Sequence, residues 1–472
     1  MEKKFPRLDI WFILLVFIIS RLLIFFAGIQ MDYGALYRYW QYLDISTLRS
    51  DLLRGIWFDH TQPPVFNFLL GIVVKTFGSH ARLAFILLLK GITLANTFLL
   101  LSILKKVSHR PYLPLLLSLL YLLSPATILF ENELFYTSLI TCLLLTATRH
   151  LIRLQKEARW SHVLGLYIPL VLVCLTRSMY HIVWLAALSM IIYLWRRRQP
   201  NVRRIILGAA LSLLLVGSWY VKNYIIFHQF STSTWMGMNM ARNVFHDATV
   251  TDSTQIASIE PFSKISDYQR FLPAHYGHRY TGLDDRDLLQ EWKNDSFINE
   301  KHVAYIEVSR QYAAESKKAI LAHPVAYLKN VLQSAIIFFA PGTRYPTTEY
   351  LSEKIAWYDV LYSFNLSHFA HGKQQRRIAL TISALPKFII YFLTFFFLFR
   401  RPKKLPYPLL TLFITCIIGY IFAVSSLFEH YENMRFRYEA EPLFLILVAI
   451  VLTNRLHNSR FKYTFTAESH PG

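Results

Sequence analysis

Long runs of apolar residues alternate with short polar segments along most of the 472-residue chain. Several of these runs reach the roughly 20 residues that an α-helix needs to cross the hydrocarbon core of a bilayer. The first covers residues 10–29; it is longer than the core of a signal peptide and has no small-residue cleavage site, so we expect it to remain as a membrane span. The pattern predicts an all-α polytopic membrane protein.

Clusters of Lys and Arg separate the apolar runs, and in membrane proteins such clusters face the cytoplasm. Six clusters carry this signal, within residues 3–7, 105–110, 149–159, 196–204, 400–404 and 455–462. All six lie on the cytoplasmic side together only if about ten helices cross the membrane and both chain ends stay inside. The predicted spans are 10–29, 82–104, 111–130, 134–152, 161–177, 179–195, 204–221, 378–399, 405–427 and 438–455.

Two further apolar segments, residues 65–77 and 325–340, do not fit this arrangement as spans. If either crossed the membrane, the basic clusters that follow it would move to the outside. We therefore expect both to be juxtamembrane helices on the outer face. The resulting organisation has these parts: a transmembrane module 1–221 with a first outer loop 30–81, a large outer loop region 222–377, C-terminal spans 378–455 and a cytoplasmic tail 456–472.

The composition agrees with this class, because 54% of the residues are hydrophobic and the mean hydropathy is +0.33, too apolar for an ordinary soluble domain. A net charge of +21 would indicate nucleic-acid binding in a soluble protein. Here the charge follows the topology and attracts anionic headgroups, so we expect membrane lipids and no nucleic acid as partners. Cys142, Cys174 and Cys416 lie inside apolar runs without metal-ligand spacing, so we expect neither a disulfide nor a cysteine metal site.

Asp32 closely follows the first span, at the helix end where the helix dipole disfavours a carboxylate. A carboxylate in this place can deprotonate an acceptor hydroxyl or hold a divalent cation. The alternative is an interfacial Asp that only ends the helix. Three residues of the same loop, Tyr37, Asp59 and His60, are supporting candidates.

Glu131 and Glu133 flank Asn132 in the short turn between the third and fourth spans. Two carboxylates are costly to hold near the hydrocarbon edge, which favours a polar site. The alternative is a hydrated turn whose acids stabilise the start of the next helix. We take Asp32, Glu133 and Glu131 as the candidate catalytic acids. The sequence leaves open whether a divalent cation is bound; Asp32 and Glu133 are its expected ligands if one is.

Arg177, Arg435 and Arg437 lie on the predicted outer side, where the positive-inside rule disfavours arginine. The planar guanidinium donates paired hydrogen bonds to phosphate and stays charged, so the three are candidate ligands of a lipid phosphate. The alternative is anchoring to lipid headgroups by snorkelling. The outer-side histidines, His60 among them, show no metal-motif spacing and are expected at the surface.

Several short motifs follow one another in order: an acid after the first span, HTQPP at residues 60–64, the acid pair after the third span, LTR at residues 175–177 and NMRFR at residues 433–437. Together they resemble the GT-C class of membrane glycosyltransferases, above all the protein O-mannosyltransferases and the aminoarabinose transferases. Two departures are Asp32-Tyr33 in place of Asp-Glu, and Gln62 in place of His before the two prolines. They leave the acceptor type and the role of His60 open.

The resemblance implies a transferase that moves a sugar from a polyprenyl-phosphate donor to a lipid, glycan or protein acceptor, on the periplasmic face of a bacterial inner membrane. By position, Asp32 matches the acceptor-activating acid, and Glu133 with Glu131 matches the second acid. Arg435 and Arg437 match the ligands of the lipid phosphate. The alternative is a transporter or flippase of lipid-linked glycan precursors, which the lack of an inverted repeat or of a pair of Gly- or Pro-broken spans disfavours.

Overall fold

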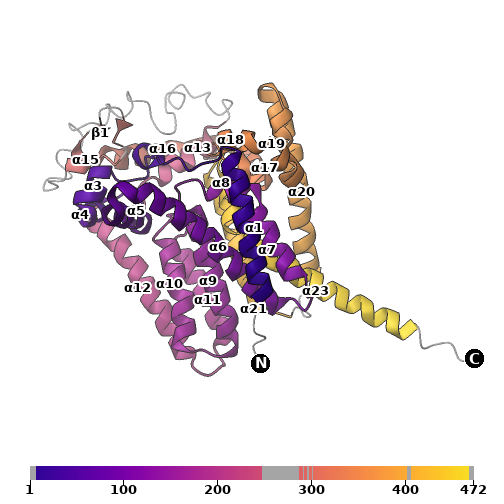
Figure 1. Ribbon diagram of the computed structural model, residues 1–472. Helices are drawn as coiled ribbons and strands as arrows, with labels where there is room; N and C mark the ends of the chain where they lie inside the picture. The colour runs from indigo at the N-terminus through magenta and orange to yellow at the C-terminus, as the bar shows by residue number, and fades with distance from the viewer. Residues whose placement is uncertain are drawn as a thin grey trace, which may run out of the picture.

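Most of the described residues are helical. The computed structural model describes residues 7–246, 286–290, 292–294, 297–299, 301–400 and 406–466. Within these ranges the strands are β1 (Trp292–Asn294) and β2 (Phe297–Ile298), which form one short antiparallel pair. The longer helices stand as a bundle, and shorter helices cover one end of it (Figure 1).

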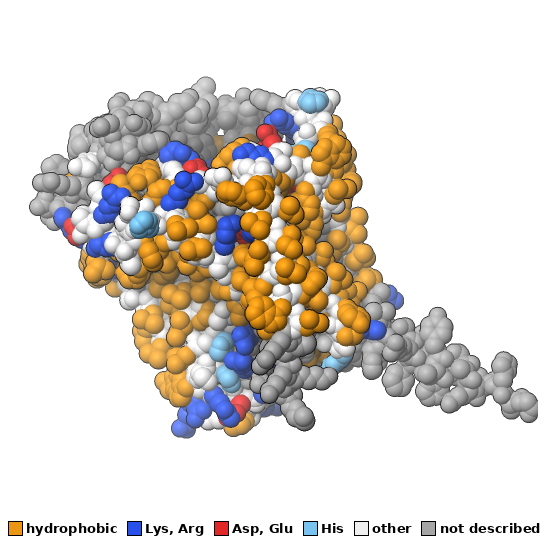
Figure 2. Space-filling view, viewed as in Figure 1, with side chains coloured by type: hydrophobic (Ala, Val, Ile, Leu, Met, Phe, Trp, Pro, Cys, Tyr) orange, Lys and Arg blue, Asp and Glu red, His pale blue; other side chains and the backbone are white. Residues whose placement is uncertain are grey.

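Five helical segments in the described part of the chain are long and apolar enough to cross a membrane, by length and composition. They are Leu8–Phe26 in α1 (Arg7–Phe26), Pro64–Val107, Val202–Phe227 (α12), Gln374–Arg400 in α20 (Gly372–Arg400) and Pro408–Phe428 (α21). Hydrophobic side chains cover much of the visible side of the bundle, and many of the visible Lys and Arg side chains gather toward its two ends (Figure 2). These features are those of an all-α membrane protein.

Each of the ten predicted spans coincides with helical structure. Besides α1, α12, α20 and α21, the helices at these positions are α6 (Ala81–Val107), α7 (Leu113–Leu123), α8 (Pro125–Phe130), α9 (Thr137–Lys156), α10 (Trp160–Cys174), α11 (Ile182–Arg196), α22 (Asn433–Glu439) and α23 (Glu441–Thr466). Two segments differ from a single helix: 111–130 is divided at Ser124, and the last span is divided at Ala440. Pro125 and Pro442 lie at these breaks, where a proline lacks the N–H that would continue a helix.

The segment 65–77, predicted as a juxtamembrane helix, is α5 (Pro64–Phe77). It starts at a proline in the first helical position and ends at Gly78, whose φ of +51° is open to glycine at little cost. A 3-10 turn, Gly78–His80, then leads into α6. Figure 1 shows α5 lying across the end of the bundle, in contrast to α12, which runs along it.

The segment 325–340 is α17 (Pro324–Phe339), which packs against α20, α21 and α22. The other short helices at this end are α2 (Ala35–Arg38), α3 (Ile45–Ser50), α4 (Leu52–Phe58), α13 (Met236–Val244), α15 (Arg286–Leu289), α16 (Ala304–Ala322), α18 (Glu349–Ser352) and α19 (Ala356–Ser363). α13 packs closely against α16. A Cβ atom added at Gly237 of α13 would come within 1.8 Å of the Ser309 carbonyl oxygen of α16, so this close approach requires glycine. The last six residues, 467–472 of the predicted tail, lie outside the described ranges.

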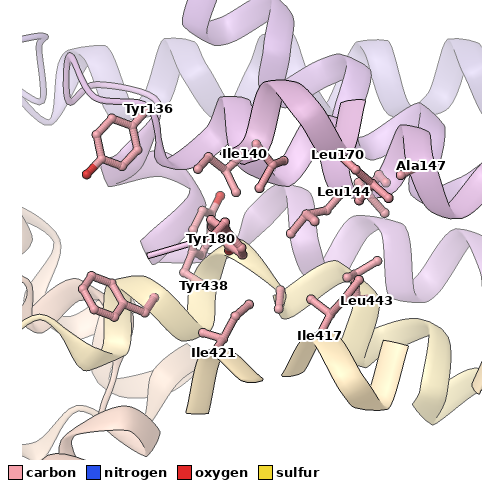
Figure 3. Close-up of a cluster of buried hydrophobic side chains, with 14 of the residues drawn as sticks. Tyr136, Ile140, Leu144, Ala147, Leu170, Tyr180, Ile417, Ile421, Tyr438 and Leu443 are labelled. Atoms are coloured by element: carbon pink, nitrogen blue, oxygen red, sulfur yellow. The ribbon is translucent and has the colours of Figure 1, made fainter. Parts of the chain in front are cut away.

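The main core lies between α9, α10, α21 and α23. Figure 3 shows Ile140, Leu144 and Leu170 from α9 and α10 facing Ile417 and Leu443 from α21 and α23. All five are buried. Because lipid tails are as apolar as leucine, close packing and internal hydrogen bonds hold such helices together in a membrane.

Candidate functional site

A cavity of about 330 Å³ lies where the covering helices meet the bundle. Its walls come from the predicted first outer loop (30–81), the turns beside α9 and α11, the segment 230–242, the end of α21 and the start of α22. The polar and charged residues among those that line it are Gln41, Gln62, Arg177, Ser178, His181, Ser231, Thr232, Ser233, Asn239, Arg242, Glu429, Glu432 and Arg435. It is a site with three guanidinium groups and two carboxylates.

Arg435 lies on α22, a helix whose residues are all buried. The Asn433 side chain fixes the start of this helix by donating to the backbone oxygens of Ser425 (2.8 Å) and Glu429 (3.3 Å). The Arg435 guanidinium is paired with Glu432 and lies over the rings of Phe135 (4.5 Å) and Tyr345 (5.1 Å). Its Nε and Nη1 atoms are buried and have no hydrogen-bond partner within the described residues. Unpartnered buried donors are costly, so this guanidinium is suited to an oxygen-rich ligand.

Arg177 lies in the turn after α10 and lines the same cavity. Its side chain is paired with Glu439, which also accepts a hydrogen bond from the Tyr180 hydroxyl at 2.7 Å. The guanidinium lies 3.6 Å from the centroid of the Phe436 ring, a cation–π contact. Arg177 is therefore fixed in place, with its charge at the cavity wall.

Arg437, the third predicted phosphate ligand, does not line this cavity. Its Nε lies 3.5 Å from Glu441 Oε2, and its Nη1 lies 3.5 Å from the Phe339 carbonyl oxygen. Glu441 in turn pairs with Lys387 of α20 at 2.8 Å. Arg435 and Arg437 are only two positions apart on α22. Arg435 lines the cavity, whereas Arg437 links α22 to α17 and α23.

Arg242, Glu429 and Glu432 are cavity residues that the sequence reasoning did not select. Arg242, on α13, lies 3.2 Å from Glu429 and 3.6 Å from Glu432. Burial, together with the neighbouring Glu432, raises the pKa of Glu429 to about 7 in spite of Arg242. Glu432 is slightly more exposed, and Arg435 and Arg242 outweigh the effect of its burial and lower its pKa. The only sequence signal for these residues was the position of two of them beside the NMRFR motif.

Glu133 lies behind Arg435 and is not one of the cavity-lining residues. Its Oε1 accepts hydrogen bonds from the hydroxyls of Tyr39 (3.1 Å) and Thr347, whereas Oε2 is buried and has no partner among the residues that the structure describes. Burial raises the pKa of Glu133 to about 7, although Thr347, Tyr39 and the charge of Arg435 act in the other direction. The charge of Arg435 therefore acts on Glu133, although Glu133 does not line the cavity.

Asp32 lies outside the cavity, on the first outer loop. It pairs with Arg38 and accepts a hydrogen bond from the Gly34 amide at 2.9 Å, and 36% of its side chain is exposed. Burial, Glu133 and, more weakly, Asp32 raise the pKa of Tyr39, so both acids act on this one hydroxyl. Tyr37, on α2, is more than one third exposed.

Glu131 faces away from Glu133, into the bundle. Its two oxygens accept hydrogen bonds from Nε (2.9 Å) and Nη2 (2.8 Å) of Arg21 on α1, and Lys90 on α6 lies 3.3 Å away. The carboxylate is fully buried. Because it neutralises two cations from two helices, its geometry is that of a structural ion cluster.

Asp59 and His60 contact Thr234 and Lys301, which lie far from them in the sequence. Asp59 pairs with Lys301 at 2.8 Å, and His60 contacts the Thr234 hydroxyl (2.8 Å) and the Lys301 carbonyl oxygen (2.9 Å). His60 is fully buried, so the expectation that it lies at the surface was wrong. Burial lowers its pKa to about 4, which keeps the ring neutral.

Within the described residues no group of three or more His, Cys, Asp or Glu side chains has a geometry that could hold a metal ion. Asp32 and Glu133, the predicted ligands, each bond to other protein groups. The residues present do not fit a divalent cation held by these two acids.

Comparison of the chain with protein-family models, with curated proteins and with solved structures finds no match.

Proposed function

We propose that this protein is a membrane glycosyltransferase that moves a sugar from a polyprenyl-phosphate donor to an acceptor on the outer face of the membrane. The observation that carries the proposal is Arg435, a buried guanidinium at the wall of a cavity of about 330 Å³ that Arg177 and Arg242 also line; two of its nitrogens have no hydrogen-bond partner in the described part of the chain. Arginine is the side chain best suited to a phosphate at membrane depth, because it stays charged and donates bidentate hydrogen bonds. The order of motifs typical of the GT-C class supports the same activity.

The proposed topology has ten spans with both ends in the cytoplasm, in a bacterial inner membrane. The position of the cavity supports it, since the residues that line the cavity come from segments that the charge pattern assigns to the outer side, such as 176–181 and 429–436. In this arrangement α5 and α17 lie at the outer face. Labelling of a Lys75→Cys variant from outside intact cells tests this, because Lys75 is exposed on α5. Labelling from the cytoplasm only would refute the ten-span arrangement.

In the proposed reaction the oxygen of the acceptor hydroxyl attacks the anomeric carbon of the sugar. The bond from that carbon to the phosphate oxygen breaks, its electron pair goes to the phosphate, and the acceptor proton goes to a carboxylate. Arg435, Arg177 and Arg242 stabilise the charge that develops on the leaving phosphate. A direct displacement of this kind inverts the anomeric centre.

Asp32 and Glu133 are positioning residues in this proposal. Glu133 accepts from Tyr39 and Thr347, and Tyr345 in the same segment lies under Arg435. Glu133 thus holds the first outer loop and the segment 345–347 against the arginine. Asp32 acts on the loop through Arg38 and Tyr39.

The test uses purified protein with polyprenyl-phosphate donors that carry a labelled sugar, and with membrane lipid, envelope glycan and protein as acceptors. We expect transfer by the wild type and a loss of at least about 100-fold in Arg435→Met, the scale of removing one transition-state donor. Arg197→Met, at an exposed arginine after α11, is the matched control and should keep the wild-type rate. Movement of the donor between leaflets of proteoliposomes without transfer to any acceptor would overturn the proposal in favour of a flippase.

A further inference from the structure

Glu429 and Glu432 both line the cavity and share one guanidinium. Arg242 reaches Glu429 with Nη1 at 3.2 Å and Glu432 with Nη2 at 3.6 Å. Two carboxylates held this close to each other compete for the same positive charge. Their other partners decide which of them stays ionised.

The other partners of the two acids are unequal. Glu432 is also paired with Arg435, so two guanidinium groups hold it as a carboxylate. Glu429 has Arg242 and the backbone N–H of His430 at 2.9 Å, and its side chain is 9% exposed. When two neighbouring carboxyl groups have environments this different, one of them stays ionised and the other can bind and release a proton.

The backbone holds Glu429 firmly at the cavity. It follows directly on α21, and its carbonyl oxygen accepts from the Ser334 hydroxyl (2.9 Å) and from the Asn433 side chain (3.3 Å). Ser334 belongs to α17 and Asn433 to α22, so two helices fix the position of this residue. A side chain fixed in this way can present its carboxylate in one place to a bound substrate.

We infer that Glu429 is the catalytic base of the proposed sugar transfer and takes the proton of the acceptor hydroxyl. The inference rests on the proposed function. In the step, the acceptor O–H bond breaks and its proton goes to the Glu429 carboxylate. The acceptor oxygen bonds to the anomeric carbon, and the polyprenyl phosphate leaves with the electron pair of its C–O bond. The acid is then a neutral carboxyl group, which returns its proton to solvent.

The charges that face Glu429 suit this role. Arg242 of α13 and Arg435 of α22 favour its ionised form, Glu432 disfavours it, and His430 and His246 lie stacked beside it. Burial and the neighbouring Glu432 raise the pKa of Glu429 above that of a free glutamate, and the donor phosphate would raise its basicity further by adding negative charge. Burial raises the pKa of Glu133 as well, but this acid is not among the cavity-lining residues.

The experiment measures the transfer rate against pH for the wild type and three variants, with the binding of sugar-free polyprenyl phosphate as a second readout. Glu429→Gln should lower the rate at least about 100-fold and remove its rise with pH near 7, while polyprenyl phosphate still binds. Glu429→Asp should restore part of the rate together with that rise. Glu133→Gln should keep the rise with pH, and so separates two acids of similar pKa.

Each other result counts against the inference. A Glu429→Gln protein that keeps the wild-type rate and pH profile overturns it and leaves the proposed function standing. Loss of polyprenyl phosphate binding in both Glu429 variants makes the residue structural, which also overturns it. Absence of transfer by the wild type, in contrast, refutes the proposed function itself.

Discussion

Arg21 and Arg435 are both buried arginines paired with a glutamate, yet their surroundings differ. Arg21, on α1, uses all three guanidinium nitrogens: two bind Glu131, and Nη1 donates to Ser20 Oγ and the Leu122 carbonyl oxygen, both at 3.0 Å. Arg435 uses one nitrogen, for Glu432, and the other two have no hydrogen-bond partner within the described residues. Of these two arginines, Arg435 lines the cavity and Arg21 does not. A buried arginine with all donors used holds helices together, whereas one with donors left over beside a cavity is suited to a ligand.

The largest effect should come from Glu131→Gln. The change leaves Arg21 and Lys90 without their anion inside the bundle. Breaking a buried ion pair in this way typically costs about 3–5 kcal/mol. The free energy of unfolding, measured in detergent micelles, should fall by that amount. An unchanged stability would show that the Arg21 cluster is not structural and would break the comparison.

The next effect concerns pH and His60. Because burial lowers its pKa from 6.5 to about 4, the unfolded chain binds more protons than the folded one between these values. Stability should therefore fall as the pH drops from 6.5 to 4, by about 3 kcal/mol for this residue. Unfolding of the wild type and of His60→Gln at a series of pH values measures it. The same slope in both proteins would assign the pH dependence to other groups.

Arg435→Lys and Arg437→Lys test the comparison within one helix. Lysine cannot reproduce the planar fork, so Arg435→Lys should reduce donor binding and transfer by about 10- to 100-fold, or roughly 1.4–3 kcal/mol, with little loss of stability. Arg437→Lys should act mainly on stability, because Arg437 contacts Glu441 and Phe339 and not the cavity. Transfer assays and thermal unfolding of the two proteins give both readouts. The reverse pattern would assign the phosphate to Arg437 in place of Arg435, whereas the motif resemblance implies both.

Asp32→Asn should have the smallest effect, a reduction of transfer by less than about 10-fold. The side chain is 36% exposed and pairs with Arg38, an interaction of a kind that contributes little at a surface. Steady-state rates of the variant and of Arg38→Gln, its partner, should be alike. A complete loss of transfer in Asp32→Asn alone would make Asp32 catalytic, the role that its position after the first span implies.

The helices were largely predictable from the sequence. Side chains that face lipid must be apolar, so runs such as 204–221 and 378–399 reveal α12 and α20 without knowledge of their neighbours. The breaks at Ser124 and Ala440 lie at Pro125 and Pro442. The apolar pattern alone did not predict them, because each of these segments is long enough for a single span. Only helix ends were less certain, since caps depend on local contacts.

The site was predictable only in part. Arginines on the side predicted to face outward are unusual enough to attract attention, and two of the three predicted phosphate ligands line the cavity. The contact between Arg242 and Glu429 joins residues 187 positions apart, which no local pattern encodes. Glu131 and Glu133 are two residues apart, yet the fold turns one toward Arg21 and the other toward Tyr39. That division depends on which helices lie on each side of the turn.

The start of α5 has a consequence for engineering this protein. The Val65 amide donates a hydrogen bond to the Leu175 carbonyl oxygen at 2.9 Å, two residues before Arg177. The bond uses main-chain atoms alone, so most side-chain changes at Val65 or Leu175 should leave this link between the start of α5 and the turn that carries Arg177 intact. A proline at position 65 would remove the donor and is the change to avoid there.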